Sequence, residues 1–224
     1  MATAKRELNF LLAEPERRLL RRIAARLPSR VTSNHLTALG VLGSVGTGVA
    51  YALSGFDNAW LWVASGMLAV NWFGDSLDGT LARVRKAERP RYGYYLDHIV
   101  DAFSTAAIGI GIGLSPFVSF PLAMGLVVLY LTLSINVYLE SQVFGVFKLS
   151  YGIIGPTEAR IILVLANGLL VAVPQMHGTP LWLVAVAGNV VAGLLALGML
   201  TTLVVRFGKN LHRLARLEPR KRPA

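Results

Sequence analysis

The chain has no cysteine, and only 15% of its 224 residues are charged. The absence of cysteine excludes disulfides, a thiol nucleophile and thiolate-bound metal. A soluble domain usually has about a quarter of its residues charged, whereas 54% of this chain is hydrophobic, so the composition favours a membrane protein. The polar N-terminus also lacks an apolar run followed by a small-residue cleavage site, so we predict no removable signal peptide.

Six apolar stretches are each long enough to cross a bilayer as a helix. About 20 helical residues span roughly 30 Å of hydrocarbon, and a helix satisfies its own backbone polar groups there. We therefore predict an all-α, polytopic membrane protein with six transmembrane helices. The predicted spans are 36–55, 59–82, 94–115, 117–140, 160–175 and 181–205.

The basic residues all fall on one side of these spans. Eight of the 22 Lys and Arg precede the first span, five lie between the second and third, two between the fourth and fifth, and seven follow the sixth. The positive-inside rule then predicts cytoplasmic N- and C-termini. The net charge of +10 suits contact with anionic headgroups, so we predict membrane lipids and no nucleic acid as partners. The Arg- and Ala-rich composition suggests a bacterial plasma membrane.

Residues 15–27 place apolar side chains on one helical stripe and arginines on the other face. This pattern predicts an amphipathic helix in the cytoplasmic interface, with an ordinary solvated helix as the alternative. Residues 209–224 are predicted to form a basic, partly disordered tail. The predicted organisation is thus an interfacial segment 1–33, a six-helix transmembrane domain 34–206 and a basic cytoplasmic tail 207–224.

Four aspartates lie at the predicted cytoplasmic ends of the second and third spans. Asp75 and Asp78 are spaced i, i+3, and Asp97 and Asp101 are spaced i, i+4, so each pair shares one helical face. A carboxylate near a membrane interior is costly and usually marks function. The short connection predicts that the two helices are antiparallel neighbours, so the pairs can converge. Four such carboxylates would repel one another unless cations lie between them.

All-oxygen ligation without Cys or His clusters favours a hard ion, Mg²⁺ or Mn²⁺. Four carboxylates suffice to hold two such ions about 4 Å apart, an arrangement that clamps phosphoryl oxygens. The alternative is that the aspartates only form ion pairs with arginines of the following connection, Arg83, Arg85 or Arg91.

Small residues border the aspartates. Gly79 lies one turn beyond Asp75, Ala82 lies about one turn beyond Asp78 or Gly79, and Gly93 lies one turn before Asp97. They leave room for a flat base or a diphosphate, although helix packing would also explain a single glycine. Arg83 is placed to meet phosphate charge at the mouth of the site.

The pattern Asp75-x2-Asp78-Gly79-x2-Ala82-Arg83-x9-Gly93-x3-Asp97-x3-Asp101 resembles the signature of the CDP-alcohol phosphotransferase family at every fixed position. The resemblance implies a six-helix membrane fold, a homodimer, and a cytoplasmic site where two divalent metal ions hold the diphosphate of a CDP-linked substrate. The metal ligands would be Asp75, Asp78, Asp97 and Asp101, the last also being the general base. The nucleotide would be bordered by Gly79, Ala82, Arg83 and Gly93, and by Asn34 and Thr37 at the start of the first span.

The family contains two directions of transfer. Some members take CDP-diacylglycerol and a small alcohol such as inositol phosphate, glycerol phosphate or serine, and others take CDP-choline or CDP-ethanolamine and diacylglycerol. His98 after Asp97, and the pair Thr157 and Glu158, look similar to the second branch, which we favour from the sequence. Arg160 could equally meet a phosphorylated alcohol, which keeps the first branch as the alternative.

Two of these residues have more than one interpretation. His98 could share or replace the base role of Asp101, since imidazole titrates near neutral pH, or merely form a hydrogen bond at the interface. Glu158 could bind a cationic headgroup or pair with Arg160. An ion-coupled transporter is a remote alternative, because it would place acids near the midplane of broken helices within a repeat, and no repeat is present.

Overall fold

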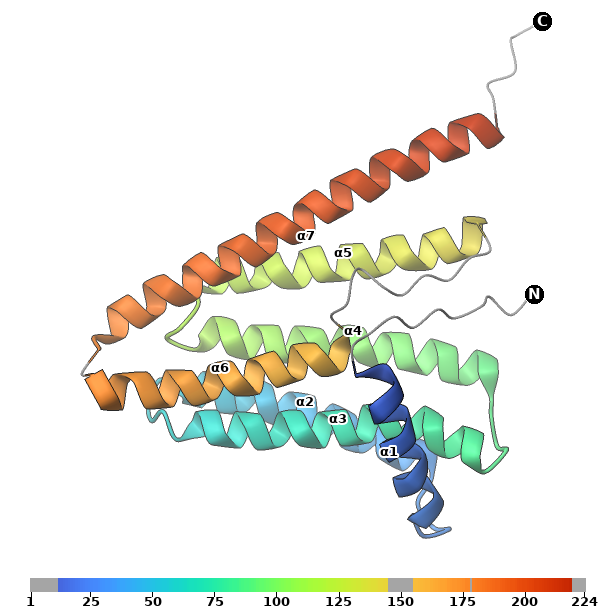
Figure 1. The fold of residues 1–224 in the computed structure, drawn as a ribbon, viewed down its shortest axis with the longest axis horizontal. Helices are drawn as coiled ribbons and strands as arrows, with labels where there is room; N and C mark the ends of the chain where they lie inside the picture. Colours follow the sequence, from blue (N-terminus) through green and yellow to red (C-terminus); the bar gives the residue numbers. More distant parts are fainter. Residues whose placement is uncertain (1–11, 145–154, 178, 219–224) are drawn as a thin grey trace, which may run out of the picture.

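The computed structural model describes residues 12–144, 155–177 and 179–218, and within these ranges every regular element is an α-helix (Figure 1). The helices are α1 Ala13–Arg26, α2 Ser33–Leu53, α3 Trp60–Val84, α4 Pro90–Leu114, α5 Phe120–Phe144, α6 Pro156–His177 and α7 Leu181–Leu217. The all-α class predicted from the apolar runs is confirmed for these residues.

Each predicted span corresponds to one helix, from α2 to α7. By length and composition, α2, α5 and α7 are long and apolar enough to cross a membrane. The other three helices are more polar, because α3 and α4 each carry two of the aspartates and α6 carries Glu158 and Arg160 near its start. Several long apolar helices in one chain make this an integral, multi-pass membrane protein.

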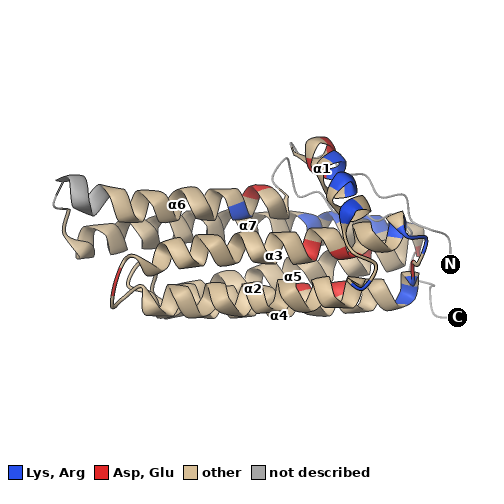
Figure 2. Ribbon diagram, turned by 90° about the horizontal axis from the view of Figure 1, so that it is seen from below, with Lys and Arg blue, Asp and Glu red and all other residues tan. Residues whose placement is uncertain are grey.

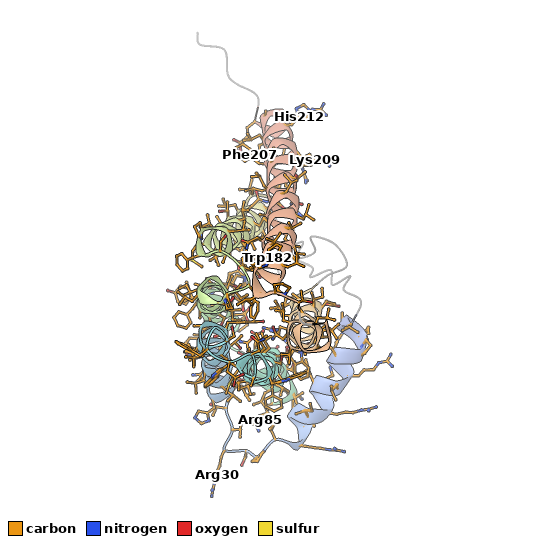
Figure 3. All side chains as sticks on the ribbon, turned by 90° about the vertical axis from the view of Figure 1, so that its left-hand side faces the viewer. Arg30, Arg85, Trp182, Phe207, Lys209 and His212 are labelled. Carbon is orange, nitrogen blue, oxygen red and sulfur yellow. The ribbon has the colours of Figure 1, made fainter. Side chains whose placement is uncertain are left out.

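The last helix is longer than the sequence predicts. The predicted span ends at residue 205 and the predicted tail begins at 209, but α7 continues to Leu217. Most residues in this extension are Leu, Arg, Ala or Lys, which are strong helix formers, and the next proline is at position 219. Figure 3 shows this part of α7, with Phe207, Lys209 and His212, projecting away from the other helices. The predicted basic tail is therefore helical as far as Leu217.

Helix α2 packs against both helices that carry the aspartates. Gly40 of α2 and Gly74 of α3 approach so closely that a Cβ on Gly74 would overlap the backbone of α2. Gly48 of α2 and Gly111 of α4 make a second close approach of the same kind. Among the described helices, α3 with α4 is not one of the main packing pairs. Small residues let α2 approach both helices, so α3 and α4 are held together largely through their packing on α2.

Helix α1 crosses the bundle near one of its ends (Figure 1). Its Leu20 and Ala24 are buried in a cluster with side chains of α2 and α3, so its apolar stripe has a packing partner within the chain. Where α1 ends, Arg85 Nη2 donates hydrogen bonds to the carbonyl oxygens of Leu27 and Pro28, at 3.1 and 2.8 Å. The amphipathic segment is therefore a docked helix, fixed along its length and at its C-terminal end.

Basic residues gather at the end of the bundle where α1 lies (Figure 2). The connections at the opposite end, residues 54–59, 115–119 and 178–180, contain no Lys or Arg. The charge asymmetry behind the predicted cytoplasmic side is thus an asymmetry between the two ends of the folded bundle.

Candidate metal and substrate site

A cavity lies between α2, α3 and α4 at the level of the aspartates. Three of the four aspartates singled out from the sequence line it, together with a threonine and an asparagine. The lining residues are Thr37, Gly40, Asn71, Asp75, Asp78, Asp97, Val100 and Ser104.

Three of the four carboxylates form a tight cluster. Asp75, Asp97 and Asp101 each present one carboxylate oxygen, and these three oxygens lie within 4.8 Å of one another. Asp78 lines the same cavity, but its Oδ2 accepts a hydrogen bond of 2.6 Å from Thr37 Oγ1 on α2. The two helical pairs therefore converge, with three members in the cluster and the fourth bonded to α2.

An arginine from α6 reaches this cluster. Arg160 donates through Nη2 to Asp75 Oδ2 at 2.6 Å and through Nε to Asn71 Oδ1 at 2.9 Å. Asn71 in turn donates to the carbonyl oxygen of Gly40 at 2.9 Å. The side chains of Arg160 and Asp75 are 17% and 22% exposed, so water screens their attraction only in part. The site thus combines three carboxylates with one cation held in a defined orientation.

His98 lies beside the cluster and outside the cavity lining. Its Nδ1 is 3.3 Å from Asp97 Oδ2. Its ring packs against Tyr94 and Tyr138, with ring centroids 4.1 and 4.5 Å away. The two tyrosines therefore hold the imidazole next to a carboxylate of the site. Which of His98 and Asp101 would act as the base stays a prediction.

The other residues predicted to border the nucleotide lie around the basic end of α2 to α4. Asn34 Nδ2 is 3.4 Å from a tyrosine hydroxyl of α4. Gly79 and Ala82 are partly exposed on α3, and a Cβ on Gly79 would contact the Arg83 guanidinium at 3.4 Å. Gly93 is exposed, and a Cβ there would meet no described atom within 4 Å. None of these five residues lines the cavity itself.

The Thr–Glu pair at the start of α6 contacts the N-terminal part of the chain. Thr157 Oγ1 donates to Glu16 Oε1 at 2.7 Å. The carboxylate of Glu158 accepts hydrogen bonds from the backbone N–H groups of Leu12 and Gly155, at 2.8 and 3.0 Å. Both side chains fasten α1 to α6, and neither lines the cavity.

Two residues of this region were not found from the sequence. Asn71 is 2% exposed and connects α2, α3 and α6. Its place one turn before Asp75, as a polar residue within an apolar span, is the signal that could have identified it. Glu16 offers no such signal, because its hydrogen-bond donors on other helices lie 56 to 141 positions away in the sequence.

The carboxylate cluster fits a hard divalent cation. Its three candidate ligand atoms are all carboxylate oxygens, which Mg²⁺ and Mn²⁺ prefer, and the chain has no cysteine to offer softer ligands. Three clustered carboxylates repel one another, and Arg160 neutralises one charge. Asp75, Asp97 and Asp101 are therefore the residues that would hold such an ion.

The fold and the site together define a class: an integral membrane protein with a cavity among its helices and a cluster of aspartates suited to a divalent metal. The family model of the CDP-alcohol phosphatidyltransferases matches residues 30–205, which is most of the chain. The protein therefore belongs to this family. The match confirms the family that the aspartate motif indicates.

One curated relative gives a more specific comparison. A phosphatidylinositol phosphate synthase of Cutibacterium acnes is 36% identical to the chain over 90 residues. The similarity covers 40% of this chain and 41% of that relative, so the chain matches less than half of the relative's length.

Proposed function

We propose that the protein transfers a phosphatidyl group from CDP-diacylglycerol to a hydroxyl of a phosphorylated small alcohol, with release of CMP. The observation that carries this proposal is Arg160, a partly shielded cation 2.6 Å from Asp75 at the carboxylate cluster. A guanidinium in this place suits the phosphate of an acceptor, because guanidinium groups can bind phosphate through two parallel hydrogen bonds. The similarity to a phosphatidylinositol phosphate synthase supports the same direction of transfer.

This proposal adopts the branch that the sequence offers as the alternative. The sequence favours CDP-choline or CDP-ethanolamine as donor because of His98, Thr157 and Glu158. In the structure the carboxylate of Glu158 accepts backbone hydrogen bonds, and Thr157 donates to Glu16. Neither is directed at the site, so two of the three supports for a cationic headgroup are lost.

In the proposed reaction the acceptor oxygen forms a bond to the lipid-side phosphorus of the diphosphate. The bond from that phosphorus to the bridging oxygen breaks, and CMP leaves with the electron pair. Asp101 takes the hydroxyl proton, with His98 as the second candidate because of its 3.3 Å approach to Asp97. Asp75, Asp97 and Asp101 would hold a divalent ion, which would neutralise part of the diphosphate charge. Arg160, oriented by Asn71, holds the acceptor phosphate near the reacting hydroxyl.

The finer features predicted from the sequence belong to the same proposal. They comprise six spans within residues 34–206, cytoplasmic termini in a bacterial plasma membrane, a homodimer, and a second metal ion for which Asp78 would be a ligand. The proposed nucleotide-bordering residues are Gly79, Ala82, Arg83, Gly93, Asn34 and Thr37.

The test is release of CMP by the purified protein with Mg²⁺ or Mn²⁺. CDP-diacylglycerol is combined with inositol 1-phosphate, glycerol 3-phosphate, serine or free inositol, and CDP-choline and CDP-ethanolamine are each combined with diacylglycerol. We expect CMP with CDP-diacylglycerol and at least one of the two phosphorylated alcohols, and much less with serine or free inositol. Turnover restricted to CDP-choline or CDP-ethanolamine would restore the other branch, and no CMP from any pair would refute the proposed activity.

A further inference from the structure

One carboxylate of α1 is hydrogen-bonded to both α3 and α6. Glu16 Oε1 accepts from Trp72 Nε1 at 2.6 Å and from Ser76 Oγ at 3.3 Å, both on α3. The same oxygen accepts from Thr157 Oγ1 of α6 at 2.7 Å. Figure 1 shows α1 crossing the bundle where α3 and the start of α6 lie. Glu16 is therefore a direct polar link between two helices that are far apart in the sequence.

The donors are neighbours of site residues along their helices. Ser76 directly follows Asp75, and Thr157 lies three residues before Arg160, which is one helical turn. Backbone hydrogen bonds make each of these turns rigid, so a link between the turns limits how far they can separate. The hydrogen bonds to Glu16 thus limit the distance between Asp75 and Arg160, whose Oδ2 and Nη2 atoms are 2.6 Å apart.

Other contacts keep α1 from moving relative to these helices. Leu20 and Ala24 are buried in the α1–α3 cluster, and Arg85 bonds to the carbonyl groups where α1 ends. At the other end, the N–H of Leu12 donates to Glu158 on α6 at 2.8 Å. These contacts lie on both sides of Glu16 along α1, so Glu16 is held in one place. Its hydrogen bonds can therefore fix the distance between α3 and α6.

We propose that Glu16 is a positioning residue that sets the separation between the carboxylate cluster and the cation that receives the acceptor phosphate. This inference rests on the proposed function. Asp97 and Asp101 lie on α4, which packs mainly on α2 and α5, so loss of Glu16 should displace Arg160 more than the rest of the cluster. Binding of the acceptor should therefore suffer more than binding of the CDP-lipid.

The kinetic test compares Glu16→Ala, Glu16→Gln and Glu14→Ala. Glu16→Ala removes the oxygen that accepts the three hydrogen bonds, and Glu16→Gln keeps a carbonyl oxygen that can still accept them. Glu14 is exposed on the same helix and pairs only with Arg17, at 3.4 Å, in the described structure. For Glu16→Ala we expect an increase of about tenfold in the KM of the acceptor, since displacements near 1 Å can cost that much or more. In Glu16→Ala the KM of the CDP-lipid should stay near the wild-type value. In Glu16→Gln the acceptor KM should return most of the way to the wild-type value, and in Glu14→Ala both KM values should equal those of wild type.

A spectroscopic test examines the contact without turnover. The chain has four tryptophans, so the difference between the emission of wild type and of Trp72→Phe isolates the Trp72 signal. We expect Glu16→Ala to shift this signal and Glu14→Ala to leave it unchanged, because the indole N–H loses its partner only in the first variant. If the Trp72 emission is identical in wild type and Glu16→Ala, the contact does not exist in solution and the inference is overturned.

The remaining outcomes separate this inference from the proposed function. An unchanged acceptor KM in Glu16→Ala, or an equal loss for both substrates that Glu16→Gln does not recover, overturns the positioning role. If wild-type protein releases no CMP with any substrate pair, the proposed function fails. Calorimetric binding of inorganic phosphate then replaces KM, and Glu16→Ala should bind it about tenfold more weakly if the positioning role holds.

Discussion

Asp101 lies in the carboxylate cluster with Asp75 and Asp97, and the proposal gives it the proton of the acceptor hydroxyl. Asp101→Asn keeps the shape of the side chain and removes its basicity. We expect CMP release to fall by about 10²- to 10⁴-fold, the usual contribution of a general base. The matched control is Asp57→Asn, an exposed carboxylate in the connection 54–59 whose role as acceptor for Ala59 N–H an asparagine can retain. A similar loss in both variants would contradict a specific role for Asp101.

Two buried asparagines, only one of which contacts Arg160, allow an effect on stability to be distinguished from an effect on the position of Arg160. Asn71 is 2% exposed and accepts from Arg160, while Asn167 is 1% exposed and accepts from Tyr51 at 2.9 Å. Replacing either by Leu leaves buried polar partners unsatisfied, at a cost of about 1–3 kcal/mol. We expect Asn71→Leu and Asn167→Leu to lower the melting temperature in detergent to a similar extent. The acceptor KM should rise only in Asn71→Leu, and a comparable rise in Asn167→Leu would show that the effect is one of general stability.

The sequence indicates the reacting groups of the site better than the groups that hold them. The aspartates can be identified because carboxylates at helical spacing in apolar spans are energetically costly and usually mark a functional site. Their partners are not visible, because Thr37 lies 41 positions from Asp78, and Arg160 lies 85 from Asp75. Such pairs are set by tertiary packing, which local periodicity does not encode.

At the scale of the helices, the close approach of α2 and α3 decides whether the site forms. A Cβ on Gly74 would overlap Gly40 and the carbonyl oxygen of Leu36, whereas a Cβ on Gly66 of the same helix would meet nothing within 4 Å. Gly74→Leu must therefore separate the two helices and displace the adjacent Asp75. We expect it to abolish CMP release and lower the melting temperature, and Gly66→Leu to do neither. Wild-type activity in Gly74→Leu would contradict the close packing.

The helices themselves are largely predictable, because apolar runs of about 20 residues specify them directly. Their ends and their partners are less so. The end of α7 differs from the prediction because helix-forming Leu, Arg and Ala residues continue to Leu217 beyond the apolar run. The position of α2 between α3 and α4 depends on glycines, such as Gly48 and Gly111, whose partners lie on other helices.

For the molecule as a whole, the basic residues and the candidate site lie towards the same end of the bundle. Basic residues, α1 and the carboxylate cluster all lie towards the end that the positive-inside rule assigns to the cytoplasm (Figure 2). A CDP-linked lipid has its diphosphate and nucleotide at the membrane surface and its acyl chains in the bilayer. A site near the end of the helices can therefore bind the polar part while the lipid stays in the membrane.

This orientation can be tested directly because the chain has no native cysteine. Single cysteines are introduced for Arg30 between α1 and α2, for Lys209 on α7, and for Phe56, which is 87% exposed in the connection between α2 and α3. With six spans we expect a membrane-impermeant maleimide to label Arg30→Cys and Lys209→Cys from the cytoplasmic side, and Phe56→Cys only from the other side. If only α2, α5 and α7 crossed, the number of spans would be odd and the first two sites would lie on opposite sides. Labelling in intact cells and in inverted vesicles distinguishes the two arrangements, and permeabilised membranes supply the control that each cysteine can react.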